Sequence, residues 1–116
     1  MLNEYSIGDS RELLKEVDSS SVDLIYIDPP YCTGRDFYHF NDKFKSSQDY
    51  REQLIKPMIT ECHRILSDVG NIVVHVEPKV SHHIRIVLDE IFGEKRFKNE
   101  IVWISGGNHK SLKQLQ

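Results

Sequence analysis

Three short apolar runs stand out along this chain. Residues 22–27, apart from Asp23, and residues 72–76 and 101–104 each form such a run, which predicts strands that are buried on both faces, as in the centre of a parallel sheet. Residues 5–7 predict a further short edge strand or strand end, and residues 68–71 combine Asp, Gly and Asn in a predicted turn. The pattern therefore indicates three or four strands.

Apolar residues with helical spacing lie between these runs. Over residues 48–66 they recur every four positions, which predicts a helix that Pro57 must kink or split, because proline lacks a backbone donor. A second helix, ending at Gly93, is predicted by the apolar residues of one face: Val80, Ile84, Val87, Leu88 and Ile91. Near the N-terminus, Asp9 or Ser10 is the expected cap of a short helix.

The order of these elements predicts the fold class. Strand, helix, strand, helix and strand imply parallel pairing through right-handed crossovers. We therefore expect an α/β protein of the doubly wound type. Three or four strands make a thin sheet with open edges, which suggests a fragment of a larger protein.

Composition narrows the function classes. The 116 residues are 39% hydrophobic and 28% charged, as in an ordinary globular unit. The formal net charge of −3 leaves no overall basic surface, so a nucleic acid would need a local patch or a further protein region. No apolar run approaches the roughly 18 residues of a membrane span. The only cysteines, Cys32 and Cys62, argue against a disulfide framework and for a reducing cytoplasm.

The most informative stretch directly follows the first strand. Asp28-Pro29-Pro30-Tyr31 ends the apolar run with a carboxylate, two prolines and an aromatic ring. Ligands of open α/β sheets bind at the carboxyl ends of the strands, which is where this stretch is expected. The Asp28 carboxylate and the Pro29 carbonyl are two rigid acceptors that suit an NH2 group, and Tyr31 offers a face for stacking. The implied target is the exocyclic amine of a nucleobase.

Such an arrangement has a chemical consequence. The lone pair of an aryl amine is delocalised into its ring, which makes the amine a poor nucleophile. Two acceptors on the amine hydrogens localise the lone pair and favour attack on an electrophilic methyl group. A base inside a duplex is out of reach, so it would have to be flipped out. The alternative interpretation of the stretch is a plain strand-ending turn with a proline pair.

Asp28-Pro29-Pro30-Tyr31 also resembles motif IV of the amino-directed DNA methyltransferases, which use S-adenosyl-L-methionine and modify N6 of adenine or N4 of cytosine. The longer run DPPYCTGRDFYHFND is similar to that of the subclass containing the modification subunits of type III restriction systems. Ile7-Gly8-Asp9-Ser10 and residues 63–75 and 88–103 match further family segments in the expected order. The resemblance covers nearly the whole chain.

The resemblance implies a fold, an activity and partners. It implies the incomplete Rossmann-like fold of a site-specific DNA methyltransferase, with a flipped adenine as substrate, S-adenosyl-L-methionine as cofactor and a restriction or specificity subunit as a further partner. Asp28-Pro29-Pro30-Tyr31 would be the catalytic residues, and Asp9 would contact the cofactor. Residues 1–105 would form the N-terminal part of the catalytic domain, and residues 106–116 would begin a linker or target-recognition region.

The chain departs from the family pattern at two points. Cys32 stands where Asn or Gly is common, and the Phe-x-Gly-x-Gly segment that cradles the methionine part of the cofactor is absent. In this subclass that segment follows the recognition region, so the chain is expected to be the N-terminal catalytic part, and its activity alone is in question. N4 of cytosine, an RNA base or a protein amide remain alternative acceptors. A truncated, non-catalytic remnant that binds a partner subunit is an alternative of another class.

For several other residues, the sequence allows both a functional and a structural interpretation. Asp9 fits a helix cap as well as a cofactor contact. Arg35 and Lys43 fit contacts with DNA phosphates, but also a solvated loop face. His75, His82 and His83 are expected at the surface or at helix ends rather than on a metal, because the adjacent His82 and His83 point in different directions on a helix and no cysteine or suitably spaced further ligand accompanies them. Trp103 is expected in the core.

Overall fold

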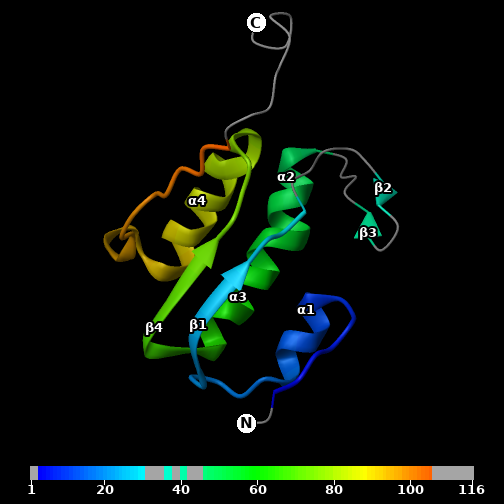
Figure 1. The fold of residues 1–116 in the computed structure, drawn as a ribbon, viewed down its shortest axis with the longest axis vertical. Helices are drawn as coiled ribbons and strands as arrows, with labels where there is room; N and C mark the ends of the chain where they lie inside the picture. The colour runs from blue at the N-terminus through cyan, green and yellow to red at the C-terminus, as the bar shows by residue number, and fades with distance from the viewer. Residues whose placement is uncertain (1–2, 31–35, 38–39, 42–45, 106–116) are drawn as a thin grey trace, which may run out of the picture.

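A computed structural model describes residues 3–30, 36–37, 40–41 and 46–105 of the chain. Two parallel strands, β1 (Val22–Ile27) and β4 (Leu66–Val74), form the main sheet. The helices α3 (Lys56–Ile65) and α4 (Pro78–Phe92) pack together behind it (Figure 1). The parallel pairing and the α/β class confirm the coarse fold prediction. The described part of the chain contributes only two strands to this sheet, fewer than expected.

The core lies between the sheet and the helices. Its fully buried side chains come mainly from α3, α4 and the segment before α3: Tyr50, Ile55, Ile59, Cys62, Val80, Ile84 and Val87. From β1, Ile25 points into this core, whereas Leu24 is 66% exposed, because successive strand residues face opposite sides. Helix α4 ends at Gly93 as predicted, where a φ of +93° suits a residue without a side chain. The turn η3 (Glu94–Arg96) follows.

The predicted helix over residues 48–66 is present as one continuous helical run, in which the hydrogen-bond pattern changes just before Pro57. It consists of α2 (Ser47–Asp49), the π-helical segment η2 (Tyr50–Ile55) and α3, with Pro57 in the first turn of α3. A proline cannot donate to the carbonyl four residues earlier, which here belongs to Gln53. That carbonyl instead accepts a hydrogen bond from Arg11 Nη1 at 3.0 Å. The Gln53 carbonyl thereby becomes an attachment point for the N-terminal segment.

The N-terminal segment forms a helix but no strand. Helix α1 (Ser10–Leu13) is capped by Asp9, as predicted, and continues into the 3-10 turn η1 (Leu14–Glu16). The strand predicted at residues 5–7 is wrong, and the side chains of Tyr5 and Ile7 are exposed. A strand needs a neighbour to take its backbone hydrogen bonds, and residues 3–9 pair with no strand in the described part of the chain.

The turn predicted at residues 68–71 is also wrong, because these residues belong to β4. Val22 pairs with Leu66, whereas Leu24 pairs with Asn71, so β4 carries a bulge between these two positions. Gly70 permits this bulge: a Cβ atom there would lie 2.6 Å from Leu66 Cδ1 and 3.0 Å from the Val22 carbonyl oxygen. The turn-forming residues interrupt the regular pairing with β1 without ending the strand.

The third strand, predicted at residues 101–104, is absent, and its apolar side chains face solvent. Trp103 is 86% exposed, so the prediction that it belongs to the core is wrong. An apolar run forms a buried strand only where a sheet edge and covering layers are present, and the described residues provide neither beside this segment. Two short strands for which no prediction was made, β2 (Asp36–Phe37) and β3 (Phe40–Asn41), pair antiparallel after the motif. No helix in the described ranges is long and apolar enough to cross a membrane.

Candidate active site at the carboxyl ends of the parallel strands

The predicted motif lies directly after β1, at the edge of the sheet where β4 also ends. A backbone hydrogen bond from His75 N–H to the Ile27 carbonyl, at 2.8 Å, extends the pairing one residue beyond Val74. This bond places Asp28 and His75 side by side, with His75 Nδ1 3.5 Å from Asp28 Oδ1. Both side chains are about half exposed, at 55% for Asp28 and 53% for His75. The carboxylate is therefore accessible to a ligand while a histidine lies within ion-pair distance.

A cavity of about 300 Å³ adjoins this carboxylate. Its lining brings together residues from β1, the motif, α1, η2 and α3: Ser10, Tyr26, Ile27, Asp28, Pro29, Pro30, Leu54 and Met58. This volume is at the low end of the range of about 300–1,000 Å³ for small-molecule sites. Three of the four predicted catalytic residues thus line one cavity, whose lining is mostly apolar and includes Asp28.

The proline pair is held from the core side by Tyr50. The Tyr50 hydroxyl donates a hydrogen bond to the Pro30 carbonyl, and the Tyr50 side chain is fully buried at the start of η2. The four-residue apolar spacing predicted that Tyr50 faces the core, but it did not indicate this bond. The signal available in the sequence was a tyrosine at a core position, because a buried tyrosine hydroxyl needs a hydrogen-bond partner.

His75 is the second residue that the sequence interpretation missed as part of this site. It was expected to be a surface or helix-end histidine. The available signal was its position immediately after the second apolar run, because the carboxyl ends of neighbouring parallel strands meet at one edge of a sheet. The described residues contain no group of three or more His, Cys, Asp or Glu side chains arranged to hold a metal ion.

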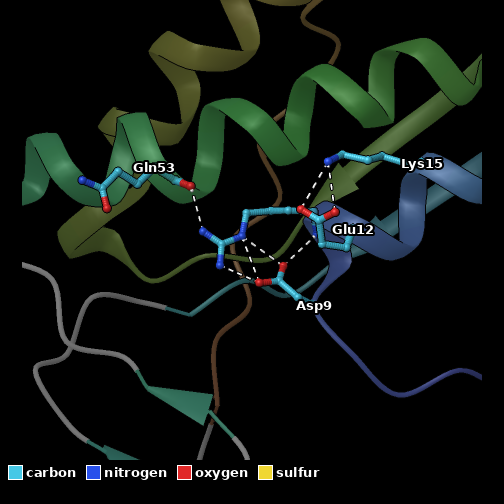
Figure 2. A network of polar contacts seen from close by, with 5 residues as sticks. Asp9, Glu12, Lys15 and Gln53 are labelled. Atoms are coloured by element: carbon cyan, nitrogen blue, oxygen red, sulfur yellow. Dashed lines mark hydrogen bonds and ion pairs between the residues drawn. The ribbon is translucent and has the colours of Figure 1, made fainter.

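Asp9 lies in a charged surface region between α1 and η2 (Figure 2). Each of its carboxylate oxygens accepts two hydrogen bonds from Arg11, at 2.9 and 3.0 Å for Oδ1 and at 3.1 and 2.5 Å for Oδ2. A neighbouring cavity of about 500 Å³ is lined by Asp9 and mostly charged residues, and it shares no lining residue with the cavity at Asp28. Ser10, next in sequence, lines the latter cavity. The cap role of Asp9 is confirmed, and its contact with a cofactor stays a prediction.

The contacts with Arg11 lower the pKa of Asp9 from its ordinary value of 3.8 to about 2, chiefly through the side-chain hydrogen bonds. Because the folded-state pKa is depressed, the pair stabilises the fold above about pH 4, and this contribution is lost as the pH falls toward 2. Solvent screening keeps the contribution small, since both side chains are about two-fifths exposed.

We expect the substitution Arg11→Ala to raise the pKa of Asp9 from about 2 toward 3.8, because it removes the hydrogen-bond donors of the guanidinium. Carboxyl ¹³C NMR during a pH titration measures this change. Lys15→Ala is the matched control, since Lys15 acts on Asp9 only through space and as the weakest contribution. An Asp9 pKa that is equal in the Arg11→Ala variant and the parent chain would contradict the assignment.

The remaining predicted site residues are Tyr31, Arg35 and Lys43, and all three lie outside the described residues. The same holds for residues 106–116. Cys62 is part of the core, where burial raises the pKa of its thiol to about 11. Its thiol therefore stays protonated at neutral pH, which suits a packing role.

The chain resembles known DNA-modifying proteins over most of its length. It is 33% identical to the type II methyltransferase M.KpnI of Klebsiella pneumoniae over 93% of this chain and 28% of that protein. It is 31% identical to the DNA adenine methyltransferase YhdJ of Escherichia coli K12 over 83% of this chain and 31% of that protein. With the type III StyLTI Mod subunit of Salmonella typhimurium, it shares 25% identity over 87% of this chain and 20% of that protein.

The chain spans less than a third of the length of each of these relatives. A family model described as DNA methylase matches residues 22–115, which include both parallel strands, the Asp-Pro-Pro motif and His75. The chain therefore belongs to the N6/N4 DNA methylase family.

Proposed function

We propose that this chain supplies the amine-holding part of a site-specific DNA methyltransferase that acts on N6 of a flipped adenine. One observation carries this proposal: Asp28, Pro29 and Pro30 line a cavity at the carboxyl ends of the parallel strands, and the Asp28 side chain is 55% exposed. A relative whose name specifies adenine, YhdJ, supports adenine over cytosine. The Mod subunits among the relatives support a restriction subunit as a partner.

The proposed chemistry uses acceptors that this chain provides. The Asp28 carboxylate and the Pro29 carbonyl accept hydrogen bonds from the amine and localise its lone pair for attack. As the N–C bond forms, the amine must lose one proton, and Asp28, which holds that amine and lies 3.5 Å from His75, is the group placed to receive it. Tyr31 is proposed to stack on the base. When bound, S-adenosyl-L-methionine supplies the electrophilic methyl group.

The described residues match only part of a site for that cofactor. The acceptor directions of the Asp9 carboxylate are occupied by Arg11, so a contact with the cofactor requires Arg11 to share or yield them. The 116 residues also contain no Phe-x-Gly-x-Gly segment. We therefore assign no step of the reaction to residues that hold the cofactor and restrict the proposal to the amine.

We further propose that β1 and β4 belong to a larger, Rossmann-like sheet. Leu24 and Tyr26 leave one face of the sheet exposed and apolar, and the apolar segment 101–104 has the composition of a central strand. Both features fit a sheet that is covered and extended by protein outside the described residues.

A titration with nucleosides tests the amine proposal on this chain without a cofactor. We expect deoxyadenosine to shift the NMR signals of Asp28 and His75, and N6,N6-dimethyldeoxyadenosine to shift them much less, because it has no amine hydrogen to donate. Deoxycytidine, which carries an N4 amine, measures the preference for adenine over the alternative acceptor. Equal responses to deoxyadenosine and its dimethyl derivative would argue against the proposed function.

A further inference from the structure

The Asp28-Pro29-Pro30 segment cannot hold its own backbone in place. Neither proline has a backbone N–H, so two of its three residues can be fixed through hydrogen bonds only at their carbonyl groups. Donors for these carbonyls must come from other elements. The geometry of the segment therefore depends on the residues that supply them.

Two donors from different elements fix the ends of this segment. On one side, the Ile27 carbonyl accepts from His75 N–H at 2.8 Å, which continues the ladder between β1 and β4. On the other side, the Pro30 carbonyl accepts from the Tyr50 hydroxyl. Asp28 and Pro29, the two residues proposed to face the amine, lie between these two fixed carbonyls.

The Tyr50 ring is well placed to hold a fixed position. It is 0% exposed and belongs to the same core as Ile55 and Ile59. It is also the first residue of the π-helical segment η2, and such segments are frequent at functional sites. A ring packed on all sides has little freedom to turn, so its hydroxyl group is a rigid donor.

We propose that Tyr50 is a positioning residue for the amine-holding segment. Its hydroxyl fixes the Pro30 carbonyl and thereby sets the direction in which the Asp28 carboxylate and the Pro29 carbonyl face the amine. This inference rests on the proposed function, since it concerns how the same acceptors are aimed. Tyr50 itself acts from the core and through Pro30.

The test compares Tyr50→Phe, which keeps the ring and removes only the hydroxyl, with Tyr5→Phe, the same change at an exposed position. Three quantities are measured on the full chain: the ¹³C shift of the Pro30 carbonyl, the preference for deoxyadenosine over N6,N6-dimethyldeoxyadenosine, and the urea midpoint of unfolding. For Tyr50→Phe we expect a changed Pro30 shift and a preference lowered by about threefold to tenfold, the effect of one hydrogen bond. Tyr5→Phe should change neither quantity.

The measurements separate a positioning role from a structural one. Binding is compared in the absence of urea, where the unfolding curves show each variant to be folded, so a loss of stability alone leaves the preference unchanged. If Tyr50→Phe shifts only the midpoint and retains the preference, the positioning role is overturned while the proposed function stands. If the parent chain itself shows no preference, the proposed function fails, and the role of Tyr50 in aiming an amine fails with it. If the ¹³C shift of the Pro30 carbonyl is unchanged in Tyr50→Phe, the inference is overturned whatever the binding preference.

Discussion

Replacing Asp28 by alanine is expected to lower the rate of methyl transfer to adenine by about 100-fold to 1,000-fold, the usual effect of removing one group that stabilises developing charge in a preorganised site. The carboxylate is one of the two acceptors proposed for the amine, and its oxygen lies 3.5 Å from His75 Nδ1. The assay follows labelled methyl groups from S-adenosyl-L-methionine into DNA. It uses the smallest assembly that methylates, whether this chain alone or with the polypeptide that completes its cofactor site.

Two variants accompany this measurement. Asp28→Asn keeps the shape but replaces one acceptor oxygen by a donor, so most of the activity should also be lost. Asp68→Ala removes an exposed carboxylate from the bulge near the start of β4, at the opposite end of the strand from His75, and should leave the rate unchanged. An Asp28→Ala protein that methylates DNA at the parental rate would refute the catalytic assignment.

Replacing Ile59 by alanine is expected to lower the free energy of unfolding by about 2–5 kcal/mol. Ile59 is 0% exposed in α3 and belongs to the single buried cluster that joins the helices to β1. The loss combines the removed apolar contacts with a cavity that its neighbours fill only in part. Urea denaturation measures it, and Ile59→Val should cost only about 0.5–1.5 kcal/mol.

Ile104→Ala is the matched control, and it also tests the fold. Ile104 is as apolar as Ile59 but is exposed, so its replacement should change the free energy of unfolding by no more than about 0.5 kcal/mol. If Ile104→Ala destabilises the chain as strongly as Ile59→Ala, then residues 101–104 form the buried third strand that their sequence indicates, and their assignment as an exposed segment is wrong.

The sequence predicted those elements whose signals are local. The cap at Asp9, the strand over residues 22–27, the irregular helix around Pro57 and the helix ending at Gly93 all depend on residues within a few turns of one another. Their caps, breaks and apolar spacing operate before distant parts of the chain meet. For this reason these predictions agree with the structure.

The failed predictions concern segments whose state depends on a partner. Residues 5–7 and 101–104 have the composition of strands but lie unpaired, and residues 68–71 have the composition of a turn but are held in β4 by pairing with β1. In each case the local preference is weaker than the presence or absence of a neighbouring strand. The sequence pattern carries no information on whether that neighbour is provided.

The candidate site shows the same difference between features with local sequence signals and contacts that depend on distant residues. Asp28 and the proline pair were identified from sequence, because an acid and two prolines at the end of an apolar run mark a strand end with fixed acceptors. The contact of His75 with Asp28 and the bond from Tyr50 to Pro30 each join residues at least 20 positions apart. These contacts were decided by the register of β1 on β4 and by the packing of η2 against the motif.

By itself, the sequence determined which chemical groups this protein carries and the α/β order of most of its elements, because spacing, capping and proline chemistry are local properties. Only the tertiary structure decided which groups meet: His75 beside Asp28, Tyr50 on the Pro30 carbonyl, and Arg11 on the Gln53 carbonyl. The physical reason is that hydrogen bonds and ion pairs act over a few ångströms. Residues far apart in sequence reach such distances only after strand pairing and core packing have placed them there.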